Sequence, residues 1–230
     1  MRQKLSYRDK TVLITGHTGF KGYWLCKMLK YLGANVVGLS DRFIFEDNQE
    51  FIKGTVDRNY LIDILDKDSL MQAVLEVRPD YIFHLAAQSL VRTSYKEPEL
   101  TWMTNLVGTL NLINAASKLD VAPTLICATT DKVYKNDGLE LRLFVEDDAL
   151  GGDDPYSASK AACEILIQST VFGQKQNLLA LGRVTSVRAG NVVGGADWSE
   201  DRLIPDIIRS SISNQPLKVR KPTAVRPWQH

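Results

Sequence analysis

The sequence predicts an α/β protein with a doubly wound parallel sheet of the Rossmann type, followed by the remnant of a smaller C-terminal lobe. Short apolar strands alternate with amphipathic helical segments over most of the 230 residues. A glycine-rich turn, Gly16–Gly22, separates the first strand from the first helix, and the second strand ends at an acidic residue, Asp41. Beyond Asn191 the alternation weakens. We therefore assign 1–190 to the Rossmann domain and 191–230 to part of a second lobe.

The first half of the chain supplies four predicted strands, each a short apolar run bounded by turn or polar residues. They cover Thr11–Thr15, Asn35–Leu39, Tyr60–Ile62 and Tyr81–Leu85. The first helix follows the glycine-rich turn and ends at Gly33, a residue that tolerates left-handed geometry. A second helix, Ser69–Val77, stops before Pro79, and the polar stretch Arg42–Asp57 is predicted as a loop.

The second half continues the alternation with longer helices. The pattern predicts helices over Pro98–Leu119, Pro155–Val171 and Leu203–Ser213, and strands over Thr124–Ala128 and Thr185–Arg188. The acidic stretch from Lys135 to Asp154 is predicted as a loop.

The composition is that of an ordinary globular protein, with 44% hydrophobic and 24% charged residues. A net charge of +1 gives no global attraction to nucleic acid or to a membrane surface. Three cysteines without a CxxC pair favour a reducing compartment, and three scattered histidines predict no metal site. No apolar run approaches the roughly 20 residues that span a bilayer. We expect a cytoplasmic protein.

The glycine-rich turn predicts a dinucleotide site. Gly16 permits the tight turn, Gly19 lets a diphosphate approach the backbone, and Gly22 allows the helix to pack closely on the strand. The free N–H groups of the helix N-terminus then face the phosphates. Asp41 is placed to accept hydrogen bonds from the adenosine ribose, which selects NAD, whereas Arg42 beside it is the signal typical of NADP.

Tyr156 and Lys160 form a candidate catalytic pair, because a spacing of four residues puts both on one helix face. A neighbouring ammonium and a nicotinamide cation would stabilise a phenolate and let the tyrosine act as a base. Tyr23 and Lys27 have the same spacing and are predicted to be helix surface. The position of Tyr156 after the fifth strand separates the two pairs.

Polar residues also follow the fifth strand, as Thr129-Thr130-Asp131-Lys132. Carboxyl ends of strands are where open α/β sheets bind ligands, so this segment is expected to face the same crevice as Tyr156. The alternative is a polar exit from the strand with a surface salt bridge.

Taken together, the motifs resemble the extended short-chain dehydrogenases, and within them the CDP-glucose 4,6-dehydratases. They are Gly16-His-Thr-Gly-Phe-Lys-Gly22, His84-Leu-Ala-Ala-Gln88, Thr130-Asp131-Lys132, Gly151-Gly-Asp-Asp-Pro-Tyr156, Tyr156-x-x-x-Lys160, Arg188-Ala-Gly-Asn191, Glu200-Asp-Arg-Leu-Ile-Pro-Asp206 and Arg226-Pro-Trp-Gln-His230. This resemblance covers nearly all of the chain. It implies NAD as cofactor, a nucleotide sugar such as CDP-glucose as substrate, and a place in deoxysugar synthesis for bacterial surface polysaccharides, including lipopolysaccharide O-antigen.

The same resemblance implies roles for individual residues. Thr130 and Tyr156, with Lys160, would act at the sugar O4 while hydride passes from C4 to NAD. Asp131 would protonate the departing C6 hydroxyl. Lys132 would be either the base at C5 or a charged stabiliser of the enolate. The implied cofactor contacts are Gly16, Thr18, Gly19, Phe20, Gly22, Asp41, Asp63, Ile64, Leu85, Ala86, Ala87, Tyr156 and Lys160, and the implied substrate contacts are Gln88, Asn191, Arg202 and Arg226.

Alternatives remain at this point. Gln88 could be a loop amide, and the two arginines could be solvated surface cations. The same Tyr–Lys pair serves nucleotide-sugar epimerases and reductases, and a catalytically silent NAD-binding protein is a third possibility. Members of the family continue past Arg226–His230 into a C-terminal lobe, so we expect residues 1–230 to bind NAD, to dehydrate CDP-glucose poorly or not at all, and to be flexible or self-associated near the C-terminus. The family also implies a homodimer or higher homo-oligomer, formed by Pro98–Leu119 and Pro155–Val171, whose apolar positions could equally be core.

Overall fold

The computed structural model describes residues 6–43, 53–136, 142–176 and 182–230. Contacts divide the chain into two compact units, Met1–Arg188 and Ala189–His230. The first unit contains the parallel sheet, whose six strands lie in the order β3-β2-β1-β4-β5-β6. The strands are β1 Thr11–Thr15, β2 Asn35–Ser40, β3 Arg58–Leu61, β4 Tyr81–His84, β5 Thr124–Thr130 and β6 Val184–Ala189. This confirms the doubly wound Rossmann fold, because the chain extends the sheet in one direction from β1 and then in the other from β4.

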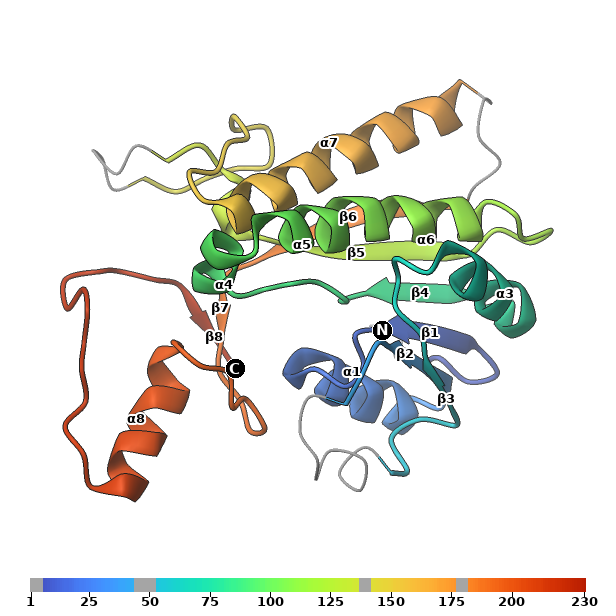
Figure 1. Ribbon diagram of the computed structural model, residues 1–230. Coiled ribbons are helices and arrows are strands. Elements are labelled where there is room, and N and C mark those ends of the chain that lie inside the picture. Colours follow the sequence, from blue (N-terminus) through green and yellow to red (C-terminus); the bar gives the residue numbers. More distant parts are fainter. Residues whose placement is uncertain (1–5, 44–52, 137–141, 177–181) are drawn as a thin grey trace, which may run out of the picture. The chain divides into compact units, whose positions relative to one another are not determined.

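Helices cover both faces of the sheet (Figure 1). On one face lies α1, Phe20–Tyr31, and on the other lie α3, Lys67–Val77, the α4–α6 region and α7, Pro155–Lys175. The side chains of β1 show why both faces need cover. Leu13 belongs to the core beneath α3 and α6, whereas Val12 and Ile14 belong to the core beneath α1. A strand buried on both faces therefore reads as a continuous apolar run.

The predicted long helix over Pro98–Leu119 is confirmed as a continuous helical run that ends at Ala116, but it contains an irregular turn. After α4, Val91–Lys96, the run consists of α5, Pro98–Trp102, a π-helical turn η1, Met103–Val107, and α6, Gly108–Ala116. Such a turn inserts a residue into the helix and is frequent at functional sites. It carries the fully buried Asn105, whose side chain bonds to groups on two other segments.

The fifth strand is longer than predicted. It runs through Thr130 and passes directly into a 3₁₀ turn, η2, Asp131–Val133. The hydroxyl of Thr130 caps this turn by accepting a hydrogen bond from the Lys132 N–H at 3.4 Å. The apolar pattern ends at Ala128, but the polar residues Thr129 and Thr130 continue the strand.

The second unit, Ala189–His230, is small. Its helix α8 spans Leu203–Ser213, as the sequence predicts, and ends at Asn214 in a left-handed conformation with φ 51°. Two short strands, β7 Asn191–Val192 and β8 Trp228–Gln229, pair in parallel. That this unit is part of a substrate-binding lobe stays a prediction. Within the described ranges of both units, no helix has the length and apolar character needed to traverse a membrane.

Candidate active site

The candidate site lies at the carboxyl ends of the strands in the first unit. There the strand order reverses between β1 and β4, which pair directly from Val12–Tyr81 to Thr15–His84. Open α/β sheets bind ligands at such a reversal. The loops that follow the strands carry the predicted cofactor and catalytic residues, with Gly16–Gly22 after β1, Asp41 after β2 and Leu85–Gln88 after β4.

The glycine-rich turn is packed against the loop after β4. Gly16 has φ 73°, and a Cβ at this position would lie 2.6 Å from the backbone nitrogen of Ala86. A Cβ on Gly22 would overlap the carbonyl oxygen of Gly16. Two of the three glycines are therefore required by close backbone approach, the first also by its left-handed conformation. The turn is compact enough to bring the N-terminus of α1 up to the sheet.

The N-terminus of α1 is suited to an anionic diphosphate. Its N-cap is Gly19, which offers no side chain to the first-turn N–H groups, and the first turn contains no acidic residue. Phe20, the first helical residue, is half-buried beside it. Those N–H groups and the positive end of the helix dipole are the features that bind the diphosphate of a dinucleotide.

Two acidic residues lie where the adenosine half of a dinucleotide would bind. Asp41 directly follows β2, and its side chain is 49% exposed, with Oδ2 3.5 Å from Nε of Arg42. After β3, the Oδ1 atom of Asp63 accepts a hydrogen bond from the Leu65 N–H at 2.9 Å. Ile64 lies between Asp63 and Leu65 and buries its side chain in the core, so only its backbone is left for a ligand contact. These residues fit NAD, because exposed carboxylates can accept hydrogen bonds from ribose and adenine.

The loop after β4 is held by a buried histidine that the residue-by-residue prediction missed. The Thr109 hydroxyl donates to the Asn105 carbonyl, so it accepts from Nε2 of His84 at 2.9 Å. Nδ1 of His84 then accepts from the Thr15 hydroxyl at 2.7 Å, and Thr15 in turn accepts from the Ala86 N–H. Burial, and secondly the Lys160 charge, lower the pKa of His84 to about 3, so the ring is neutral. The loop of Leu85, Ala86 and Ala87 is thereby fixed to β1.

Gln88 is engaged inside the protein. Its Oε1 accepts from the Leu90 N–H at 2.7 Å, and its Nε2 donates to the Leu90 carbonyl and to the Thr101 hydroxyl. Asn105 holds the Gln88 backbone, because its Oδ1 accepts from the Gln88 N–H and its Nδ2 donates to the Gln88 carbonyl, and Nδ2 also donates to the Ser159 hydroxyl at 2.9 Å. The predicted contact of Gln88 with the sugar is not favoured by this arrangement, which resembles the alternative of a loop amide.

The structure places Tyr156 and Lys160 at the start of α7, beside the end of β5. Pro155 occupies the first helical position, and Asp154 caps the helix by accepting from the Ser157 N–H at 2.9 Å. Tyr156 is 9% exposed and Lys160 5%. The Lys160 ammonium donates to the Ala128 carbonyl at 3.1 Å, which fixes the helix start to β5.

The Thr130-Asp131-Lys132 segment meets this helix start. The Lys132 Nζ lies 5.9 Å from the centroid of the Tyr156 ring, and the Thr130 hydroxyl donates to Oδ1 of Asp131 at 3.1 Å. Burial lowers the pKa of Lys160, while the neighbouring Cys163, Cys127 and Glu164 side chains oppose that shift. A hydroxyl, a phenol, a carboxyl group and two amines therefore gather at one strand end, which is the chemical inventory for proton transfer in more than one step.

An ion pair that the sequence reasoning missed lies one turn further along α7. Glu164 accepts from the Thr129 hydroxyl at 2.5 Å, from the Ser186 hydroxyl at 2.8 Å and from Nη2 of Arg188 at 3.1 Å. Although burial raises the pKa of Glu164, its bonds with Arg188, Thr129 and Ser186 outweigh that and lower it. The Arg188 guanidinium also lies 4.8 Å from the ring centroid of Tyr134. This pair joins β5, α7 and β6 behind Tyr156 and Lys160.

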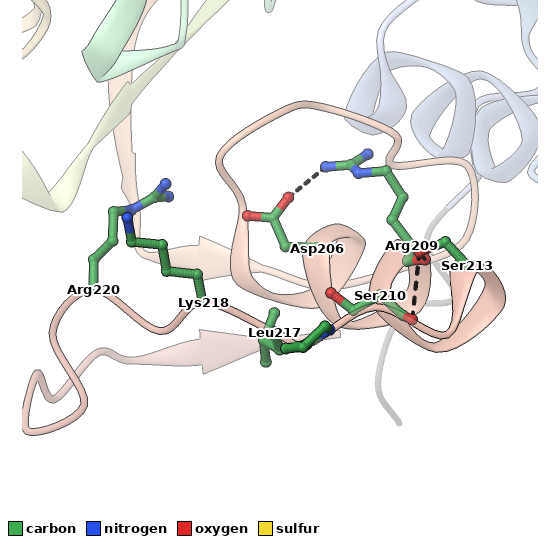
Figure 2. A pocket seen from close by; sticks show the side chains of 8 residues that line it. Asp206, Arg209, Ser210, Ser213, Leu217, Lys218 and Arg220 are labelled. Atoms are coloured by element: carbon green, nitrogen blue, oxygen red, sulfur yellow. Dashed lines mark hydrogen bonds and ion pairs between the residues drawn. The ribbon is translucent and has the colours of Figure 1, made fainter.

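The remaining predicted substrate residues belong to the second unit. Asn191 donates its N–H to the Pro227 carbonyl, Nη1 of Arg202 donates to Asp197 at 3.1 Å, and Nη1 of Arg226 donates to the Val225 carbonyl at 2.8 Å. Figure 2 shows a pocket of about 290 Å³ in this unit. Its lining includes Arg209, Lys218 and Arg220 but none of the three predicted substrate residues.

The chain is similar in sequence to proteins of a known family. A model of the NAD dependent epimerase/dehydratase family matches residues 12–230. The chain is 39% identical to the CDP-glucose 4,6-dehydratase of Salmonella typhimurium, over 100% of the chain and 65% of that protein. It is 30% identical to the dTDP-glucose 4,6-dehydratase of Neisseria gonorrhoeae, over 95% of the chain and 65% of that protein.

Among solved structures, the UDP-glucose 4-epimerase of Thermus thermophilus in complex with NAD superposes with a TM-score of 0.76. It is 27% identical, and the match covers 95% of the chain and 70% of the epimerase. The chain spans 65% of the length of the two dehydratases.

Proposed function

The chain belongs to the NAD-dependent epimerase/dehydratase family, and we propose that within this family it serves the 4,6-dehydration of CDP-glucose to CDP-4-keto-6-deoxyglucose. Its cofactor is NAD, as in the family members of known structure. The observation that carries the proposal is the meeting of Thr130-Asp131-Lys132 with Tyr156 and Lys160 at the end of β5. A 4-epimerase needs a base at O4 but no acid–base pair for C5 and C6, so Asp131 and Lys132 favour the dehydratase.

The proposed residue roles follow from the chemistry of the substrate. The Lys160 ammonium stabilises Tyr156 as a phenolate, and this phenolate, assisted by the Thr130 hydroxyl, takes the proton from the sugar O4 and becomes a neutral phenol. When bound, NAD would supply a hydride acceptor for C4 and, once reduced, a hydride donor for C6. Oxidation at C4 makes the C5 proton acidic, and Lys132 either removes that proton or stabilises the enolate as a cation. Asp131 donates a proton to the C6 hydroxyl, which leaves as water.

The Asp131 carboxyl group and the Lys132 amine thus serve opposite halves of the elimination, Asp131 at the C6 hydroxyl and Lys132 at C5. Loss of water from C5 and C6 removes a proton and a hydroxide in total, so if Lys132 is the C5 base it accepts a proton as a neutral amine while Asp131 gives one. Asp131 lies at the first position of η2 and Lys132 at the second, so their backbone is fixed by the cap from Thr130. Fixed positions matter because misplaced reacting groups cost orders of magnitude in rate.

We also propose that a second copy of the chain covers the outer face of α5, η1 and α7. Five large apolar side chains are exposed there: Leu100 at 44%, Trp102 at 38%, Met103 at 41%, Ile165 at 58% and Phe172 at 64%. Both α5 and η1 contact α7, and large apolar side chains exposed on adjoining helices are typical of a protein interface. Light scattering of the wild-type chain and of Ile165→Glu tests it, because only the wild type should form a dimer.

The test of the reaction is incubation of the protein with NAD and CDP-glucose, with detection of the 4-keto product by its absorbance in alkali and by a mass loss of one water. UDP-glucose and dTDP-glucose serve as matched substrates, and we expect CDP-glucose to be preferred. A protein extended to the length of its relatives is assayed in parallel, since the chain spans 65% of them. Formation of a 4-epimer without loss of water, in either form, would contradict the proposal.

A further inference from the structure

His17 belongs to the glycine-rich turn, but its side chain points into the protein interior. The side chain is fully buried, and its Nδ1 lies 3.0 Å from the hydroxyl of Ser40, the last residue of β2. Its Nε2 is buried without a hydrogen-bond partner in the described part of the chain. Burial lowers the pKa of His17, and hydrogen bonding with the Leu39 backbone and the Asn59 side chain opposes that shift, so Ser40 at Nδ1 is one of the polar groups around the ring.

The sheet has space for this ring only because position 38 is glycine. A Cβ on Gly38, in the middle of β2, would overlap the Cδ2 and Cγ atoms of His17. The ring is thus packed against the backbone of β2 as well as bonded to its end. Interiors are close-packed, so such a ring has little freedom to turn.

Asp41 is bracketed by bonds to the same turn. On one side, Ser40 also accepts from the Thr18 N–H at 3.4 Å, and on the other the Thr18 hydroxyl donates to the Arg42 carbonyl at 2.9 Å. The Gly16 N–H adds a third bond, to the Leu39 carbonyl, at 2.8 Å. The side chain of Asp41, the residue predicted to select the cofactor, is therefore exposed, while its neighbours Ser40 and Arg42 are both hydrogen-bonded to the turn.

We propose that His17 is a positioning residue for cofactor selection, which acts through Ser40 to hold the Asp41 carboxylate at a fixed place relative to the glycine-rich turn. The inference rests on the NAD-binding part of the proposed function and not on the dehydration. A dinucleotide whose diphosphate is held by the turn then presents its adenosine ribose to a carboxylate whose backbone is held at both neighbours. Two hydroxyls of a ribose gain hydrogen bonds there, and a 2′-phosphate meets a negative charge.

The neighbouring arginine shows why the tether matters. The Arg42 Nε atom is 3.5 Å from Oδ2 of Asp41, and both side chains are exposed. If the end of β2 could move, Arg42 would be free to turn toward a 2′-phosphate and Asp41 to turn away. Loss of the His17–Ser40 bond should therefore weaken NAD more than NADP, and so reduce the ratio of their affinities.

Two substitutions of His17 separate positioning from packing. In His17→Asn the amide occupies the place of Nδ1 and can keep the bond to Ser40, whereas in His17→Gln it reaches the place of Nε2 and leaves Ser40 without its partner. Ser40→Ala removes the same bond from the other side with little change in volume. NAD, NADP and ADP-ribose are titrated by calorimetry into each variant, and thermal unfolding is recorded alongside.

We expect Ser40→Ala and His17→Gln to bind NAD and ADP-ribose about five- to tenfold more weakly, as for a lost buried hydrogen bond, and His17→Asn to bind within about twofold of wild type. The NAD-to-NADP affinity ratio should fall about fivefold in the first two variants. Asp41→Ala should lower the ratio by itself, and adding Ser40→Ala to it should lower it no further, because the carboxylate that the bond positions is gone.

An unchanged ratio in Ser40→Ala and His17→Gln, whatever their melting temperature, would overturn the proposal and leave His17 a packing residue. Failure of the wild-type chain to bind NAD and ADP-ribose would overturn it together with the cofactor assignment. Normal binding by a protein that does not dehydrate CDP-glucose would contradict the proposed reaction and leave this inference standing.

Discussion

The chain contains the pattern Tyr-x-x-x-Lys twice, and the two copies differ in the burial of the lysine. Both tyrosines are buried, Tyr23 at 6% exposure and Tyr156 at 9%, so the prediction that Tyr23 lies on the helix surface is wrong. Tyr156 and Lys160 begin α7, both are buried, and the Lys160 ammonium bonds to the Ala128 carbonyl on β5. Tyr23 and Lys27 lie further along α1, where Lys27 is exposed and donates to the Tyr23 hydroxyl at 3.1 Å. The spacing places both pairs on one helix face, yet only one ammonium is turned toward the strand ends.

The contrast continues one turn later on each helix. Four residues after Lys160, Glu164 forms the buried ion pair with Arg188. Four residues after Lys27, Tyr31 is 91% exposed. The two Tyr–Lys pairs thus differ less in their own spacing than in what the helix is fixed to. Helix α7 is fixed to β5 and β6, whereas the first turn of α1 is the predicted diphosphate site.

The largest effect that the comparison predicts is on turnover. Tyr156→Phe keeps the ring and removes the phenolate oxygen that is proposed to accept the O4 proton, so we expect the dehydration rate to fall by about 10²- to 10⁴-fold with cofactor binding nearly intact. Tyr23→Phe also removes a phenol beside a lysine, and we expect its rate to match wild type. Single-turnover assays in a protein that dehydrates CDP-glucose measure both. Near-normal turnover by Tyr156→Phe would remove Tyr156 from its role.

How much of this could be predicted from sequence depends on how far apart the partners are. Thr130-Asp131-Lys132, Tyr156 and Lys160 were identified because contiguous motifs follow a recognisable strand and begin a recognisable helix. The turn of Gly16–Gly22 and the position of Asp41 follow from local strand–turn–helix order in the same way.

The supporting pairs were not predicted, because their partners are 23 to 25 residues apart and meet only once the sheet is assembled. They are His17 with Ser40, Glu164 with Arg188 and His84 with Thr109. The π turn in the long helix was not predicted for a related reason. Asn105 leaves the regular helix to bond Gln88 and Ser159, and no local preference of Met103–Val107 signals these tertiary bonds.

The second prediction concerns the support behind the catalytic pair. Arg188→Met leaves the Glu164 carboxylate buried without its cation, and an uncompensated buried charge costs about 3–5 kcal/mol of unfolding free energy. The matching position on α1 is Tyr31, and Tyr31→Ala should change stability by no more than about 0.5 kcal/mol, because the side chain is almost wholly in solvent.

Urea unfolding of both variants at neutral pH supplies the numbers. Equal and small effects would mean that the Glu164–Arg188 pair is not a support of α7. The double variant Glu164→Gln with Arg188→Met separates the cost of the unpaired charge from that of lost packing, since removing both charges should restore much of the stability.

The smallest predicted effect is a pH dependence that separates the two lysines. Burial lowers the pKa of Lys160 from its ordinary value of 10.5, against the neighbouring Cys163, Cys127 and Glu164 side chains, so the unfolded chain holds this proton more tightly than the folded one. Between the lowered pKa and 10.5 the unfolded state therefore carries more protons, and the unfolding free energy rises with pH. One proton limits this rise to about 1.4 kcal/mol per pH unit.

Lys160→Met removes that contribution, so the stability of wild type relative to this variant should increase as the pH rises toward 10.5. Lys27→Met removes an ammonium that is exposed in the folded chain, and its profile should run parallel to wild type. Denaturation curves from neutral to alkaline pH, each variant against wild type, cancel the cysteines and tyrosines that titrate in the same range. A wild-type advantage that shrinks with rising pH would mean that the charged Lys160 is favoured by the fold. Its bond to the Ala128 carbonyl and its acidic neighbours would then outweigh its burial, and Lys160 would enter the reaction as a fixed cation.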